Sequence, residues 1–302
     1  MTSPLRQHAA WKLKTRTLAL GERTLVMGVV NITPDSFSDG GSFLDPRAAV
    51  EHSLKLLDEG ADILDLGAES TRPGSRAGGA DASVSAEEEQ ERLLPVVDGV
   101  MKFEPRAVIS VDTYKATTAR AALRAGAEIV NDVSGFAWDP KMALVCAAAK
   151  AGLVLMHTRG RPEEWRGQER LPADEVLAMV RDGLGASRTA ARAAGVADEA
   201  IVLDPGYGFG KKLGENYSLV SRQAELLSLG RPLLAGLSRK SFLGHTLAGL
   251  HGGRPAAPEE REAASIAALV AAILHGASIV RVHAVRAAKE AAAIADAVLA
   301  AR

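Results

Sequence analysis

The sequence predicts a (β/α)8 TIM barrel, an α/β fold, with an N-terminal β-hairpin. Its 302 residues can hold one barrel of roughly 250 residues with short additions. Hydrophobic residues make up 47% of the chain, which is enough for a large core. Short apolar runs alternate with segments of helical periodicity along most of the chain, and this alternation is typical of a parallel sheet covered by helices.

The first expected element is a hairpin. Residues 11–20 and 24–30 have strand-like patterns on either side of a turn at Gly21-Glu22-Arg23. We therefore divide the chain into an N-terminal hairpin or arm over residues 1–24 and a barrel domain over residues 25–302.

Short apolar runs mark the strands of the expected barrel. They cover residues 25–31, 63–67, 107–111, 128–130, 153–156, 201–203, 232–236 and 278–282. Eight such strands are what a closed parallel barrel requires. A doubly wound open sheet is the alternative fold, but it usually has Gly-x-Gly-x-x-Gly after its first strand, where this chain has Asn31-Ile32-Thr33-Pro34-Asp35.

Helical periodicity separates these strands. The expected helices cover residues 46–59, 85–103, 115–125, 140–151, 173–194, 216–227, 258–275 and 285–301. Ser85 and Glu88 have the spacing of a capping box at the start of the second helix. Glycine is expected to stop five of the helices, at Gly60, Gly126, Gly152, Gly195 and Gly276.

Composition excludes several function classes. A net charge of −1, from 36 basic and 37 acidic residues, predicts neither a nucleic-acid partner nor attraction to an anionic membrane. The single cysteine, Cys146, cannot form an internal disulfide, and its Ala-rich surroundings predict a buried thiol rather than a nucleophile. Residues 1–14 have no signal-peptide pattern and no apolar stretch is long enough to span a membrane, so we expect a cytoplasmic protein.

Polar residues follow almost every apolar run, at the strand ends where a barrel of this type has its chemistry. They are Asn31, Glu69, Asp112, Asn131, Asp132, His157, Asp204, Lys240, Arg281 and His283. Any one of them could be a capping residue, but the whole set is hard to explain by capping. The pattern therefore predicts an active site at this end of the barrel.

The set divides by chemistry. Asp112, Asn131 and Asp204 suit a heterocycle rich in N–H donors, whereas Lys240, Arg281 and His283 suit an oxyanion such as phosphate. Asn31 offers a neutral oxygen that could join a Mg²⁺ shell. His157 and His283 lack the spacing of a zinc site. We expect a pocket for a polar ring joined to a phosphate-bearing arm.

Two loops at this end are longer than usual βα connections. They cover residues 32–45 and 72–84 and contain several Gly and Pro residues. They could be surface decoration, but Phe37 and Phe43 in the first loop favour a pair of lids, because a lid needs apolar groups to cover a ring.

Several longer segments resemble the dihydropteroate synthase family. They occur in the family's order and extend over residues 25–285, as 27–41 (MGVVNITPDSFSDGG), 65–74 (DLGAESTRPG), 110–113 (SVDT), 131–132 (ND), 204–211 (DPGYGFGK), 238–241 (SRKS) and 281–283 (RVH). The long signatures are highly specific, whereas Asn131-Asp132 alone would be weak.

The resemblance implies roles for matching residues. The pterin would be bound by Asp112, Asn131, Asp204 and Lys240. Asn31, Arg281 and His283 would bind the pyrophosphate and its Mg²⁺. Phe37, Thr71, Arg72, Pro73 and Ser241 would shape the para-aminobenzoate site.

The implied reaction joins 6-hydroxymethyl-7,8-dihydropterin pyrophosphate to para-aminobenzoate and releases pyrophosphate. In the implied dissociative scheme pyrophosphate leaves first, a pterin-methyl cation forms, and the arylamine attacks it. Asp112, Lys240, Arg281 and His283 would be the catalytic residues. The resemblance also implies a homodimer.

One position departs from the family's pattern. The residue after Arg281-Val282-His283 is usually Asp, and here it is Ala284, which predicts weaker local support for His283 or Arg281. A pterin-binding methyltransferase domain serving a corrinoid partner is the alternative function, disfavoured by segments 69–74 and 238–241. A non-catalytic pterin-binding module is a third reading, weakened by the intact phosphate-binding set.

Overall fold

A computed structural model describes residues 8–33, 45–70 and 84–301. Its centre is a closed barrel of parallel strands, so the expected (β/α)8 barrel is confirmed and the open sheet is wrong. In order around the barrel the strands are β10 (Ala277–Val282), β3 (Leu25–Asn31), β4 (Ile63–Gly67), β5 (Ile109–Asp112), β6 (Ile129–Asp132), β7 (Gly152–Met156), β8 (Ile201–Asp204) and β9 (Leu233–Ala235).

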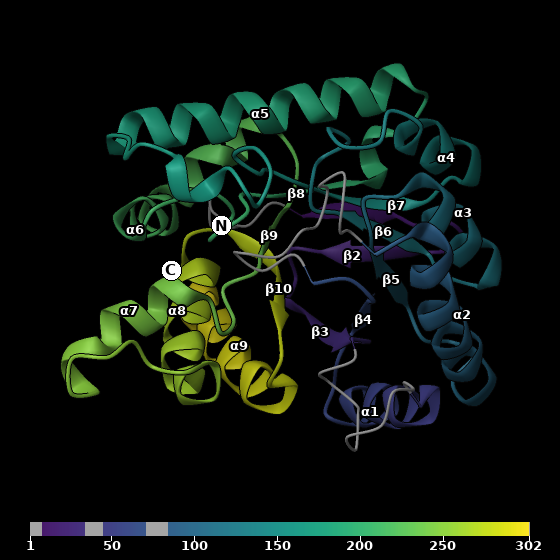
Figure 1. Cartoon of the computed structure of the whole chain (residues 1–302), viewed down its shortest axis with the longest axis horizontal. Helices are drawn as coiled ribbons and strands as arrows, with labels where there is room; N and C mark the ends of the chain where they lie inside the picture. The colour runs from purple at the N-terminus through teal and green to yellow at the C-terminus, as the bar shows by residue number, and fades with distance from the viewer. Residues whose placement is uncertain (1–7, 34–44, 71–83, 302) are drawn as a thin grey trace.

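Helices surround these strands (Figure 1). The α-helices are α1 (Pro46–Asp58), α2 (Ala86–Phe103), α3 (Ala116–Ala125), α4 (Met142–Ala149), α5 (Ala173–Ala193), α6 (Leu213–Arg222), α7 (Ser241–Thr246), α8 (Glu262–Leu274) and α9 (Val285–Ala300). Short 3-10 helices are η1 (Trp165–Gly167), η2 (Asp198–Ala200), η3 (Gln223–Leu229), η4 (Leu247–Leu250) and η5 (Pro258–Arg261). In Figure 1 α5 crosses the top, α2 to α4 lie on the right and α7 to α9 on the lower left.

Most predicted helices are confirmed with shifted ends. The capping box expected at Ser85 is present in part, because the Ser85 Oγ accepts from the backbone N–H of Glu88. The helix expected over 216–227 is divided into α6 and η3, and that over 258–275 into η5 and α8. Helix α7 has no counterpart among the predicted helices, because its six residues are too few for a periodic pattern.

The hairpin exists, but its strands are not the expected ones. Ala9–Lys12 (β1) pairs antiparallel with Thr17–Leu20 (β2), and residues 25–31 belong to the barrel instead. The physical reason is burial: Leu25 to Val30 are all buried and pair with β4 and β10 on both sides, whereas β1 and β2 each keep exposed residues.

The hairpin closes the N-terminal end of the barrel. Trp11, Leu13 and Leu20 pack against a layer of side chains from the barrel interior, formed by Leu25, Met27, Ile63, Val108, Ile129, Val154, Val202, Leu234 and Ile279. Trp11 is fully buried, and its indole N–H donates to the carbonyl of Ala200 at 2.8 Å. This end of the barrel is therefore a packed core.

Gly152 has a packing role in this layer and does not stop a helix. It is the first residue of β7, and α4 ends earlier, with Lys150 in the left-handed region. A Cβ added at Gly152 would come within 2.4 Å of the Leu13 side chain, so the hairpin can dock only against glycine. Gly126, Gly195 and Gly276 do have positive φ after their helices, as expected.

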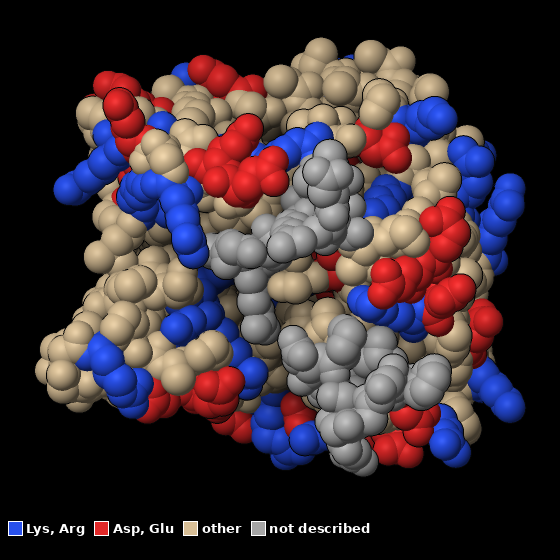
Figure 2. All heavy atoms as spheres, in the orientation of Figure 1, with Lys and Arg blue, Asp and Glu red and all other residues tan. Residues whose placement is uncertain are grey.

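The surface agrees with the balanced charge of the sequence. Figure 2 shows Lys and Arg side chains interspersed with Asp and Glu over the visible face. Within the described ranges, no helix is long and apolar enough to cross a membrane. Cys146 is a buried free thiol, as predicted, and burial raises its pKa.

Candidate active site

A cleft opens at the C-terminal end of the barrel, where the sequence predicted a site. Its open volume is about 420 Å³. It is lined by Asp112, Asn131, Val133, Met156, Asp204, Gly206, Tyr207, Phe209, Gly236, Ser238, Lys240, Arg281 and His283. The expected ring-binding and phosphate-binding sets therefore lie around one cleft, apart from Asn31.

Asp204 ends β8 and is held by the turn that follows it. Its Oδ1 accepts from the backbone N–H of Gly206 at 2.7 Å. Gly206 has φ +69°, and a Cβ there would lie 1.9 Å from the carbonyl oxygen of His157, so only glycine allows this turn. Burial raises the pKa of Asp204, opposed by its hydrogen bond from Gly206 and by the charges of Lys240 and Arg281.

A buried network joins the two sides of the cleft. The Arg281 guanidinium donates from Nε to Asp65 Oδ2 at 2.5 Å and from Nη2 to Asp112 Oδ2 at 2.6 Å. Asn131 Nδ2 donates to the same oxygen of Asp65 at 3.0 Å. Sequence reasoning gave Asp65 no role, because it lies in the middle of an apolar strand rather than at its end.

The network brings two carboxyl groups, Asp65 and Asp112, against the single positive charge of Arg281. Burial, together with the charges of Asp65 and Glu89, raises the pKa of Asp112 to about 7. Arg281 opposes that rise, because its positive charge favours the ionised carboxylate. A carboxyl group that changes its protonation near neutral pH thus faces the cleft.

Lys240 follows strand β9 and faces the aromatic ring of Phe209. Its Nζ lies 4.1 Å from the ring centroid, within the range of a cation–π contact. Phe209 lies in segment 204–211, but sequence reasoning assigned it no role, because a single aromatic residue in a turn carries no periodic signal.

His283 and Arg281 both face the cleft, since alternate residues of a strand point the same way. The Oγ of Ser238 accepts from the backbone N–H of His283 at 3.3 Å and lies 3.0 Å from Nδ1 of its ring. The Ser238 oxygen accepts the backbone N–H, and its own hydroxyl hydrogen can be donated to Nδ1. An Nδ1 that accepts carries no proton, so a neutral imidazole would carry its proton on Nε2.

Several expected site residues lie away from the described cleft lining. Asn31 is half-buried at the end of β3, and Ser241 is exposed at the start of α7. Phe37, Thr71, Arg72 and Pro73 lie outside the described residues, together with most of the two loops expected to be lids.

Three other polar strand ends, Glu69, Asp132 and His157, do not line the described cleft. Asp132 is fully buried and accepts from Ser134 and from the backbone of Phe136, which shapes the turn after β6. His157 is buried outside the cleft lining. Glu69 pairs with Lys115, which also pairs with Glu89 at 3.2 Å.

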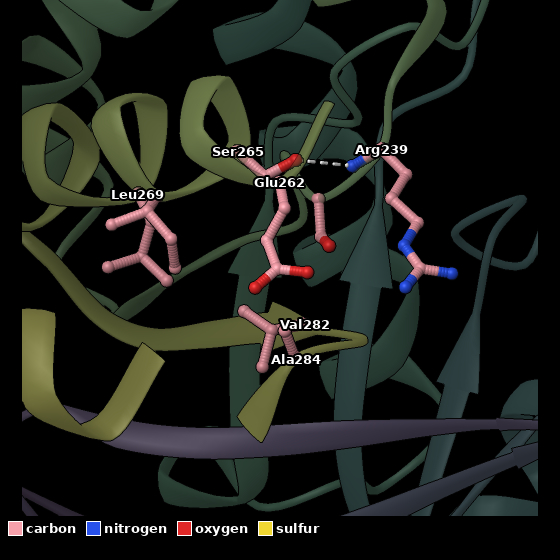
Figure 3. A pocket seen from close by; sticks show the side chains of 8 residues that line it. Arg239, Glu262, Ser265, Leu269, Val282 and Ala284 are labelled. Atoms are coloured by element: carbon pink, nitrogen blue, oxygen red, sulfur yellow. Dashed lines mark hydrogen bonds between the residues drawn. The ribbon is translucent and has the colours of Figure 1, made fainter. Parts of the chain in front are cut away.

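Ala284 occupies the N-cap position of α9 and makes no side-chain capping hydrogen bond. A hollow of about 270 Å³ lies beside it, lined also by Glu262 and Arg239 (Figure 3). The family's usual Asp at this position is a preferred N-cap residue. The described partners of Arg281 and His283, namely Asp65, Asp112 and Ser238, do not depend on residue 284.

Comparison with known proteins agrees with this geometry. The family of pterin binding enzymes matches residues 27–283. Dihydropteroate synthase of Mycobacterium leprae is 46% identical over 267 residues, 88% of this chain and 90% of the relative. These relatives favour the synthase over the methyltransferase alternative.

Solved structures resemble the whole fold. A Xanthomonas albilineans dihydropteroate synthase with 4-aminobenzoic acid has a TM-score of 0.84 and 39% identity, covering 97% of this chain and 99% of that one. A Yersinia pestis dihydropteroate synthase with a sulfonamide drug has a TM-score of 0.85 and 35% identity, covering 96% and 99%. This chain belongs to the dihydropteroate synthase family.

Proposed function

We propose that this protein condenses 6-hydroxymethyl-7,8-dihydropterin pyrophosphate with para-aminobenzoate, giving 7,8-dihydropteroate and pyrophosphate. The observation that carries the proposal is the division of one cleft into two chemistries. Asp112, Asn131 and Asp204 offer acceptors, whereas Lys240, Arg281 and His283 offer donors and positive charge. A pterin with a pyrophosphate arm needs both.

The acceptor side would bind the pterin ring. Asp204 is 5% exposed and Asn131 is 4% exposed, so hydrogen bonds from ring N–H groups would form with little competition from water. When pyrophosphate leaves, positive charge develops on the pterin methylene group. The carboxylates of Asp112 and Asp204, which both line the cleft, would stabilise that charge.

The cationic side would bind the leaving group. Two donors of Arg281 are fixed by Asp65 and Asp112, so the guanidinium plane is set before substrate arrives. His283 would donate from Nε2, the tautomer favoured by Ser238. Negative charge on the departing pyrophosphate would then meet preorganised donors.

Magnesium is the cofactor we propose. Among the described residues no group of three or more His, Cys, Asp or Glu side chains could hold a metal ion. The Asn31 oxygen at the end of β3 suits Mg²⁺, which often uses one or two protein ligands and completes its shell with phosphates and water. When bound, the ion would neutralise charge on the pyrophosphate.

The amine would bind near the mouth of the cleft. Ser241 begins α7 directly after Lys240, and the other residues expected there are Phe37, Thr71, Arg72 and Pro73. Once the bond from the methylene carbon to pyrophosphate has broken, the amine nitrogen attacks the cationic methylene carbon, forms the new C–N bond and loses a proton. A homodimer and a cytoplasmic location stay predictions from the sequence.

The test is product formation from the two substrates, measured by mass spectrometry with Mg²⁺ and with a chelator. We expect dihydropteroate and pyrophosphate in equal amounts, and much less of both when Mg²⁺ is removed. Asp204→Asn is the matched variant and should form little product.

Two outcomes would contradict the proposal. If the protein binds pterin but forms no product, the non-catalytic pterin-binding module becomes the better reading. If pterin is bound and a methyl group is transferred to a corrinoid protein, the methyltransferase alternative is correct.

A further inference from the structure

Asp65 is a fully buried carboxylate in the middle of β4. Its Oδ1 accepts from the Ser110 hydroxyl at 2.6 Å. Its Oδ2 accepts from Asn131 Nδ2 at 3.0 Å and from Arg281 Nε at 2.5 Å. One side chain thus joins strands β4, β5, β6 and β10 across the barrel interior.

Asp65 does not line the described cleft, but two of its partners do. Asn131 belongs to the side assigned to the pterin ring, and Arg281 to the side assigned to pyrophosphate. Asp65 therefore lies behind the two halves of the proposed substrate site and contacts both.

The chemistry of Asp65 fixes how these partners face the cleft. An ionised carboxylate only accepts hydrogen bonds, so the Asn131 amide must turn its nitrogen toward Asp65 and its oxygen away from it. Arg281 is held at Nε by Asp65 and at Nη2 by Asp112, and two such contacts define the plane of a guanidinium.

We propose that Asp65 is a positioning residue for the condensation, one that orients Asn131 for the pterin ring and Arg281 for pyrophosphate without contacting either. The inference rests on the proposed function. A merely structural carboxylate would affect stability alone, whereas this residue links the recognition of two chemically different parts of one substrate.

The test compares Asp65→Asn with the wild-type protein by calorimetry, using 6-hydroxymethylpterin and inorganic pyrophosphate with Mg²⁺ as separate probes. Asn keeps the size of the side chain and removes its charge. We expect pyrophosphate affinity to fall by about 100-fold, the scale of a displaced binding group. Pterin affinity should fall by about tenfold, as for one misdirected hydrogen bond. The KM for para-aminobenzoate at saturating pterin pyrophosphate should not change.

Asp62→Asn is the matched control. Asp62 is also a carboxylate that binds an arginine, Arg23, at 2.6 Å, but it lies just before β4 at the other end of the barrel. Its loss should lower stability and leave both affinities unchanged. Ser110→Ala is a second variant, which removes one hydrogen bond to Asp65 with no change of charge and should weaken both probes by roughly threefold.

A double variant separates positioning from general damage. If Asp65 acts on pyrophosphate through Arg281, Asp65→Asn should cause no further loss of pyrophosphate affinity in an Arg281→Ala background. Independent, additive losses would overturn the inference, as would unchanged affinities in folded Asp65→Asn. Wild-type protein that binds neither probe would instead contradict the proposed function itself.

Discussion

The two ends of the barrel are built from the same strands and differ in almost every property. At the N-terminal end Trp11 and Leu13 of the hairpin meet a continuous apolar layer. At the C-terminal end Asp112, Asp204 and Arg281 bring charges into a partly closed cleft. Strand β4 shows the change within three residues, from buried Ile63 to the carboxylate of Asp65.

The two ends are expected to contribute differently to stability and to binding. Apolar burial at the N-terminal end favours folding in proportion to the area removed from water. Buried charges at the C-terminal end contribute little net stability, because desolvation opposes their mutual attraction. Variants at the first end should therefore change the free energy of unfolding, and variants at the second should change binding.

The largest expected effect is at the N-terminal end. Trp11→Ala should lower the free energy of unfolding by about 3–5 kcal/mol, because it leaves a cavity under the barrel and removes the hydrogen bond to Ala200. Pterin affinity should not change in the folded variant. Denaturant unfolding checks the first value, with Phe103→Ala, an exposed site, as control. Equal losses in the two variants would contradict the assigned role of the hairpin.

Asp204→Asn should change pterin binding and leave stability intact, the reverse of Trp11→Ala. Loss of a charged acceptor should weaken pterin binding by about 1.5–3 kcal/mol and leave pyrophosphate binding unchanged. The free energy of unfolding should not fall, because burial already raises the pKa of this carboxyl group and disfavours its charge. Calorimetry with each ligand and an unfolding curve test both statements. Unchanged pterin affinity would refute the assignment of Asp204.

A third prediction concerns pH. Because burial raises the pKa of Asp112 to about 7, the carboxyl group is protonated below that pH and loses acceptor capacity for ring N–H groups. Pterin affinity should therefore rise with pH through neutrality, by at most about tenfold per pH unit. Titrations between about pH 5.5 and 7.5 test the slope. The slope should flatten in Asp112→Asn, and an equal slope there would assign the titration to another group.

The smallest expected effect is at Ala284. Asp at this N-cap should stabilise α9 by about 1 kcal/mol. Glu262 lines the same hollow, and its negative charge would oppose part of the gain (Figure 3). The gain should thus be larger in a Glu262→Gln background. Thermal unfolding of the four combinations measures both quantities, and a loss of stability on Ala284→Asp in both backgrounds would exclude the capping role.

Most of the polar residues at the C-terminal end of the barrel can be predicted from the sequence. Strand ends are visible in a sequence because an apolar run stops at a polar residue, and Asp112, Asn131 and Asp204 were found this way. The same rule also selects Asp132 and His157, which lie outside the cleft lining, because a polar side chain at a strand end can equally turn toward its own backbone or the core.

Other features depend on contacts between distant segments. Asp65 acquires its partners only when β4, β5, β6 and β10 close around it. The predicted pairing of residues 11–20 with residues 24–30 was wrong, because residues 25–31 pair with β4 and β10 in the barrel instead. The local sequence pattern does not show which of two possible strand partners is preferred. Phe209 likewise meets Lys240 only through the fold.

We expect the strand ends and the turns that follow them to form the pterin-binding half of the site, and residues 34–44 and 71–83 to serve the amine. The direct measurement replaces residues 34–44 and 71–83 by short Gly-Ser linkers and titrates bare pterin into the variant, with an unfolding curve to confirm a wild-type core. We predict pterin affinity within about twofold of wild type, as for independent regions, and product formation lowered by about 100-fold or more. A tenfold or larger loss of pterin affinity in the folded variant would contradict the account.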